Sequence, residues 1–260
     1  MALEKTILIS ALLAGLLSLD VMAAFQFMLS RPLVAASLTG LALGQASVGL
    51  SLGCLMELIW VGALPVGSVV PPDFSCASIF AVASAVLARQ ANPSIPWESC
   101  VVWALLWSIP VAGLGGWLEQ FQRRWQRLLG QAAMRRLELG HESALGEALA
   151  ASLLMTFARG FAFTALVLAA LAKPMLFILG RVYEPAHEAL QWMYWLGLLL
   201  GFVVVMDQFW ERRWLRACAI SFVISAVLIY AFSLSGAHVL GLAAFAALVA
   251  ASIQERRSRA

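Results

Sequence analysis

Four ionisable residues lie within or next to strongly apolar stretches of this sequence, namely Asp20, Glu57, Asp73 and Arg159. An ionisable group in the hydrocarbon of a membrane costs on the order of 3 kcal/mol even on the mildest scale, so each is a candidate functional residue. Carboxylates accept hydrogen bonds from hydroxyl groups in a fixed geometry. The three carboxylates therefore favour binding of a ligand rich in hydroxyls.

Glu57 is the strongest candidate. It lies in the apolar run 50–60, with no cation within one helical turn along the chain. A ligand that uses its charge is the simplest explanation for so costly a group, and a structural ion pair, for instance with Arg159, is the alternative. We expect Arg159 to neutralise one of the carboxylates rather than to contact a ligand.

Asp73 ends the sequence Pro71-Pro72-Asp73, in which consecutive prolines break a helix and leave carbonyl groups unpaired. Free backbone groups beside a carboxylate suit a ligand with many hydroxyls. The alternative role for Asp73 is to cap the N-terminus of the following helix, with Ser75 as a second candidate for that cap.

Asp20 and Gln26 form a further candidate pair. Six positions on a straight helix correspond to a rotation of about 240°, so both side chains face one cavity only if the segment bends. Asp20 can otherwise be a residue at a helix end in the membrane interface.

The composition indicates what must position these residues. Of the 260 residues, 62% are hydrophobic and 12% are charged, and the mean hydropathy is +0.89. Each membrane-spanning helix needs about 20 apolar residues, which leaves room for about six crossings. Lipid offers backbone groups no hydrogen-bond partner, so we predict an all-α, polytopic helical bundle in a single membrane domain, 1–260. The net charge of only +3 argues against a nucleic-acid partner.

The segment 119–143 divides the chain into an N-terminal half, 1–118, and C-terminal helices, 144–260. It is rich in arginine and reads as a cytoplasmic, partly amphipathic loop helix. Counting crossings from it places 183–188 outside the cell and two further basic clusters, 211–216 and 256–259, in the cytoplasm. We therefore predict a cytoplasmic C-terminus.

Two glycine pairs lie close together, Gly40 with Gly44 and Gly49 with Gly53. On a straight helix they would point to nearly opposite sides. Either this helix packs tightly on two sides, or it breaks near Gln45-Ala46-Ser47 and forms a re-entrant hairpin.

Motifs for nucleophilic catalysis, nucleotide binding or metal binding are not recognisable in the sequence. The histidines are scattered, and the four cysteines are widely spaced and read as buried apolar residues. We therefore predict no catalytic residue, phosphohistidine, cofactor or metal on this chain.

Several motifs across about residues 15–90 together resemble the IIC component of the mannose/fructose/sorbose family of the bacterial phosphotransferase system. They are Phe25-Gln26-Phe27, Arg31-Pro32-Leu33-Val34-Ala35, Gly53-Cys54-Leu55-Met56-Glu57-Leu58, Gly62, Gly67-Ser68-Val69-Val70-Pro71-Pro72-Asp73 and Ala77-Ser78-Ile79.

This resemblance implies a permease subunit of the bacterial cytoplasmic (inner) membrane that carries a hexose-type sugar. The family has inverted repeats, broken helices and re-entrant hairpins, which we expect in the N-terminal third, and it moves a core domain in elevator fashion. The resemblance also implies pairing with a IID membrane subunit, assembly as a trimer of such heterodimers, and cooperation with soluble IIA and IIB, the sugar being phosphorylated from IIB. The family's substrate contacts correspond here to Asp20, Gln26, Glu57 and Asp73.

The sequence departs from the family pattern at two places. The stretch between Gln26 and Arg31 is two residues longer than in many members, and Pro65 stands where mannose-type members often have an asparagine. Two other functions therefore stay open. One is a proton- or cation-coupled transporter subunit using Glu57 and Asp73, and the other is a non-transporting scaffold derived from the permease.

Overall fold

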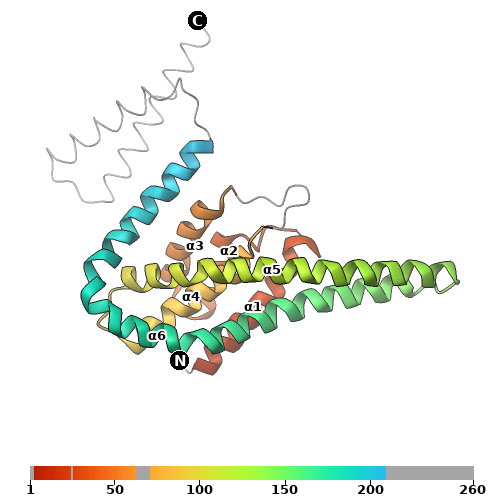
Figure 1. The fold of residues 1–260 in the computed structure, drawn as a ribbon, viewed down its shortest axis with the longest axis horizontal. Coiled ribbons are helices and arrows are strands. Elements are labelled where there is room, and N and C mark those ends of the chain that lie inside the picture. The colour runs from red at the N-terminus through yellow and green to blue at the C-terminus, as the bar shows by residue number, and fades with distance from the viewer. Residues whose placement is uncertain (1–2, 25, 63–70, 209–260) are drawn as a thin grey trace, which may run out of the picture. The chain divides into compact units, whose positions relative to one another are not determined.

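The computed structural model describes residues 3–24, 26–62 and 71–208. The chain divides into two compact units, Met1–Val205 and Met206–Ala260, and nearly all of the described residues belong to the first. The regular elements in these ranges are all α-helices: α1 (Leu3–Met22), α2 (Pro32–Ala42), α3 (Ala46–Trp60), α4 (Phe74–Ala91), α5 (Trp97–Glu138) and α6 (Ala144–Gln208) (Figure 1). The predicted all-α bundle is confirmed.

The chain breaks near Gln45, which was one of the two alternatives for the glycine pairs, and the break turns α2 and α3 into a hairpin. Gly44 has a φ of +73°, a conformation that glycine adopts without steric cost, and the Gln45 N–H donates to the carbonyl of Gly40 at 2.7 Å. With 11 and 15 residues, both helices are shorter than the roughly 20 residues of a full span.

The same glycines allow the two helices of the hairpin to touch backbone to backbone. A Cβ on Gly40 would lie 2.7 Å from the Cα of Gly49, and a Cβ on Gly49 would lie 2.5 Å from the carbonyl oxygen of Ala36. Both interpretations of the glycine pairs are therefore correct in part, because the chain breaks and the two resulting helices pack tightly.

Helix α4 is the most deeply buried element of the first unit. Every residue from Phe74 to Ala88 is buried, and the helix packs against α1, α2, α3 and α5. Its sequence is rich in alanine and serine, whose small side chains let neighbouring helices approach on all sides. Residues at the start of α4 are therefore closely surrounded by other helices.

Helix α5 joins a buried apolar half to the basic segment without interruption. We read 119–143 as a loop helix; the structure has a helix here as far as Glu138, which is continuous with α5, and a short turn then leads into α6. At about 1.5 Å per residue its 42 residues extend roughly 63 Å, about twice the hydrocarbon thickness of a bilayer. Figure 1 shows the ends of α5 and α6 that meet at this turn lying side by side as an antiparallel hairpin. We call this hairpin, residues 126–152, the arm.

Helix α6 is also longer than predicted. We expected the chain to turn at 183–188, yet these residues are helical within a helix of 65 residues. Pro174 and Pro185 each remove one backbone hydrogen bond, and the helix bends in its second half (Figure 1). The local polar residues thus mark a bend and not a loop.

Three of these helices, α4, α5 and α6 as far as Leu199, are long and apolar enough to cross a membrane. The predicted basic clusters 211–216 and 256–259, together with Pro65 and Cys218, lie outside the described residues. The division of the chain at 118 and 143 and the inverted repeats stay predictions.

Candidate functional site

Asp73 and Arg159 form a buried ion pair between the start of α4 and the first half of α6. Asp73 Oδ2 lies 2.9 Å from Arg159 Nη1, and the two side chains are only 4% and 10% exposed. Asp73 Oδ1 accepts the N–H of Cys76 at 3.0 Å and thereby caps α4, as its alternative role predicted. One carboxylate therefore neutralises a buried cation and satisfies a helix end.

Glycines in α5 bring the Pro71-Pro72-Asp73 segment against that helix. A Cβ on Gly115 would lie 2.6 Å from the Cβ of Asp73, and a Cβ on Gly116 would lie 2.9 Å from the carbonyl oxygen of Pro71. The Asp73 N–H donates to the Ala112 carbonyl at 2.9 Å.

Glu57 is paired with a cation from the motif that precedes α2. Its Oε1 lies 2.6 Å from Arg31 Nη2, and its Oε2 accepts the N–H of Leu33 at 3.1 Å. The Glu57 side chain is 23% exposed, so this pair reaches solvent-accessible surface. The suggestion that Arg159 pairs with Glu57 is wrong, because Arg159 contacts Asp73.

Asp20 binds the backbone of the segment that follows α1. Its two carboxylate oxygens accept the N–H groups of Phe27 at 2.6 Å and Ser30 at 3.0 Å, and Asp20 is 5% exposed. Gln26 is exposed and has a φ of +52°, in the left-handed region. The chain thus bends after α1, as a shared site requires, but Asp20 holds the bend while Gln26 points to the surface.

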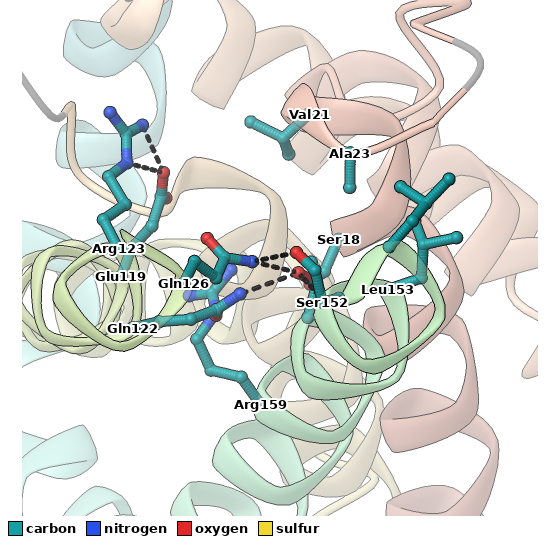
Figure 2. Close-up of a pocket in the computed structure, with 12 residues that line it drawn as sticks. Ser18, Val21, Ala23, Glu119, Gln122, Arg123, Gln126, Ser152, Leu153 and Arg159 are labelled. Carbon is teal, nitrogen blue, oxygen red and sulfur yellow. Dashed lines mark hydrogen bonds and ion pairs between the residues drawn. The ribbon is translucent and has the colours of Figure 1, made fainter. Parts of the chain in front are cut away.

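A polar pocket of about 430 Å³ lies between the end of α1, the middle of α5 and the first half of α6. This volume is within the range of small-molecule sites. Its lining residues are Ser18, Val21, Ala23, Glu119, Gln122, Arg123, Gln126, Leu149, Ser152, Leu153, Thr156 and Arg159 (Figure 2). Of the predicted residues only Arg159 lines it; Asp20, Gln26, Glu57 and Asp73 do not.

The amides and hydroxyls of this pocket were missed from the sequence. Gln122 and Gln126 are four residues apart on α5, and Ser152 and Thr156 are four apart on α6, so each pair shares one helix face. That spacing was a usable signal. It was overlooked because the glutamines fall in the basic segment that we read as a loop.

Within the described residues, His, Cys, Asp and Glu side chains form no group that could hold a metal ion. The described polar groups can bind and orient a ligand through hydrogen bonds, and Glu57 and Asp73 are each paired with a guanidinium.

The comparisons with known proteins agree with this arrangement of short and long helices. The family model described as the sorbose-specific IIC component of the phosphotransferase system matches residues 5–252. The chain therefore belongs to this family.

Individual relatives match over shorter stretches. The sorbose-specific EIIC component of Klebsiella pneumoniae is 35% identical over 129 residues, covering 46% of this chain and 45% of the relative. The mannose-specific EIIC component of Escherichia coli K12 is 33% identical over 66 residues, 25% of each chain. The chain thus spans less than half the length of these curated relatives.

Two solved structures share the fold over nearly the whole chain. One, titled as the structure of a membrane protein, has a TM-score of 0.61 at 20% identity and covers 97% of this chain and 94% of its own. The other, the mannose transporter ManYZ in complex with microcin E492, has a TM-score of 0.54 at 21% identity and covers 98% and 96%. The chain is a membrane protein with this helical fold.

Proposed function

We propose that this protein is the IIC subunit that carries a hexose-type sugar across the bacterial inner membrane in a phosphoenolpyruvate-dependent phosphotransferase system. The observation that carries the proposal is the family match over residues 5–252. Relatives named for sorbose, mannose and fructose support a sugar of this class. The sugar would be phosphorylated by a soluble IIB component after it crosses.

Glu57 is the best placed of the predicted sugar ligands. A carboxylate offers about four lone-pair sites, and Arg31 and the Leu33 N–H use two of those of Glu57. The remaining sites can accept two sugar hydroxyls, and the side chain is partly exposed. Asp20 and Asp73 are far more buried, so their participation requires a conformational change that opens them.

Such a change fits an elevator mechanism. Helices α2 and α3 pack on each other through glycines, and both contact α4, so the three helices form a compact group that could move as one body. The long helices α5 and α6 would supply the scaffold, and their internal prolines Pro110, Pro174 and Pro185 would provide bending points. Gln26, exposed beside this group, would contact the sugar from the entry side.

The expected partners are a IID membrane subunit, with which the chain would form a trimer of heterodimers, and the soluble IIA and IIB components. The cationic arm is the natural cytoplasmic element because arginine-rich segments stay on the cytoplasmic side. The same rule places the C-terminus in the cytoplasm.

The ion pairs weigh against the proton-coupled alternative. Glu57 contacts Arg31 at 2.6 Å and Asp73 contacts Arg159 at 2.9 Å. Removing the charge of Asp73 would leave the buried Arg159 guanidinium without its partner, which is unfavourable. Asp73 is therefore better explained as one half of a fixed ion pair than as a proton carrier.

Uptake of radiolabelled sorbose, fructose and mannose tests the proposal in cells that lack their own carriers for these sugars. We expect uptake only when this chain is made together with a IID partner and the soluble components, with the sugar recovered as its phosphate. The Gly130→Ala variant, whose added methyl group meets nothing within 4 Å, is the matched control. Uptake that needs a proton gradient and no phosphoenolpyruvate would contradict the proposal.

A further inference from the structure

We propose that the pocket between α1, α5 and α6 is a second sugar-binding site, separate from the predicted site at Glu57 and Asp73. This inference rests on the proposed function, since it assigns the pocket a ligand of the same class. None of the predicted sugar contacts lines the pocket, and its polar groups come from other residues.

The hydrogen bonds around Thr156 determine how the two glutamines are oriented. The Thr156 hydroxyl donates its single hydrogen to the Ser152 carbonyl at 2.9 Å. It can therefore only accept from Gln122 Nε2 at 2.7 Å and from Gln126 Nε2 at 3.1 Å. Figure 2 shows both amides reaching from α5 toward α6 in this way. Their carbonyl oxygens are consequently left to other donors.

Unused hydrogen-bonding capacity is buried beside the pocket. Gln122 is 8% exposed, and its Oε1 has no hydrogen-bond partner in the described part of the chain. The Nε of Arg159, whose side chain is 10% exposed, is likewise unpartnered there. One group is an acceptor and the other a donor. Leaving such groups unsatisfied is unfavourable, so a bound polar molecule is favoured once it reaches them.

The mixture of donors and acceptors selects a neutral polyhydroxylated ligand. Each sugar hydroxyl donates one hydrogen bond and accepts up to two, which matches amide carbonyls beside guanidinium and amide N–H groups. An anion would be disfavoured, because it only accepts and would face the glutamine carbonyls and Glu119. Arg123, the other cation of the lining, is already paired with Glu119 at 2.6 Å.

Arg159 connects this pocket to the predicted membrane site. It lines the pocket and also contacts Asp73 at 2.9 Å. With the arm on the cytoplasmic side, as proposed, the pocket would hold the sugar on its way out, at the side where phosphorylation takes place.

Protection of an introduced cysteine tests the site in the assembled complex with the native cysteines replaced. Leu153→Cys places the thiol in the pocket lining, and Ala150→Cys places it one turn earlier on α6, at an exposed residue outside the lining. Sorbose, fructose or mannose, whichever the complex takes up, is added at ten times the concentration that half-saturates protection. By mass action, alkylation at 153 should slow about tenfold and that at 150 should not change.

Loss of a pocket amide identifies where the sugar sits. Gln122→Met keeps the side-chain length and removes both polar groups, and it should abolish protection at 153 while alkylation at 150 stays normal. If that variant lowers complex yield, Gln126→Met makes the same change one turn along α5. Protection at 153 should persist in Glu57→Gln, because the two sites are separate.

Three results would overturn the inference: no protection at 153 in complexes that take up sugar normally, protection that survives the glutamine substitutions, or protection by inorganic phosphate in place of sugar. Sugar uptake by the same cysteine variants separates this failure from that of the proposed function. If no sugar is taken up in any background, both proposals are rejected.

Discussion

Glu57 Oε1 lies 2.6 Å from Arg31 Nη2, and this pair joins the two ends of the α2–α3 hairpin that lie farthest from its turn. Arg31 precedes the first residue of α2, and Glu57 falls in the last turn of α3. The Leu33 N–H, which has no partner inside its own helix at this position, also donates to Glu57. The carboxylate thus holds the open end of the hairpin and still presents acceptor sites to a ligand.

Neutralising Glu57 should therefore impair sugar binding more than assembly. In Glu57→Gln we expect complex yield near that of the wild type, because a partly exposed ion pair contributes at most about 1 kcal/mol. Uptake should show roughly 30- to 150-fold weaker apparent affinity, since charged hydrogen bonds to two hydroxyls correspond to about 2–3 kcal/mol. Uptake kinetics and complex yield from the same cells provide the measurement.

Glu138→Gln, which changes an exposed carboxylate at the end of α5, is the control for Glu57→Gln. Normal uptake in Glu57→Gln would remove Glu57 from the sugar site. Lost yield would show that its role is structural.

The Asp73–Arg159 pair should behave as one buried unit. Arg159→Met leaves the Asp73 carboxylate without its cation and should destabilise the complex by about 3–5 kcal/mol. The double variant Asp73→Asn/Arg159→Met should recover most of this loss, because Asn can still cap α4 with its side-chain oxygen. Thermal melting of the purified complex measures the coupling, and strictly additive effects of the two substitutions would contradict it.

Gly49→Ala should force the hairpin apart. The new methyl group would lie 2.5 Å from the carbonyl oxygen of Ala36, which is backbone and cannot rotate away. We expect a loss of about 1–3 kcal/mol and less folded complex on size-exclusion chromatography. Gly130→Ala adds the same methyl group on α5 with nothing within 4 Å and should have no such effect. Equal yields for the two variants would argue against close packing of α2 on α3.

The arm and the C-terminus should both lie in the cytoplasm. Single cysteines at Gln131, which is exposed near the tip of the arm, and at Ser258 are placed in a background without the native cysteines. In intact cells both should resist a membrane-impermeant thiol reagent, and in inside-out vesicles both should react. Labelling of either position in intact cells would reverse the proposed orientation.

The sequence by itself determined the class of the protein and offered the main irregularity of its fold as one of two alternatives. An apolar chain in lipid must satisfy its own backbone, which leaves helices, and that requirement is readable from composition. The glycines around Gln45 allowed a helix break as one of two alternatives, and the two prolines before Asp73 lie where no helix continues, just ahead of the start of α4. The family motifs added the expectation of a sugar permease.

Sequence patterns were less informative about where the long helices end. Arginines in the basic segment and polar residues at 183–188 suggested loops, but α5 continues through the basic segment as far as Glu138 and α6 continues through 183–188. Polar residues are as compatible with a helix that extends beyond the membrane as they are with a loop. Only the packing of the two helices into the arm decides between these outcomes.

The tertiary structure alone decided which charges meet. Asp73 pairs with Arg159, which lies 86 positions away on α6, while Glu57 pairs with Arg31 across the hairpin. It also brought Gln122 and Gln126 of α5 opposite Ser152 and Thr156 of α6 and so formed the polar pocket. Such pairings depend on how helices that are distant in the sequence pack against one another. Local residue patterns carry no information about which residues of two such helices face each other.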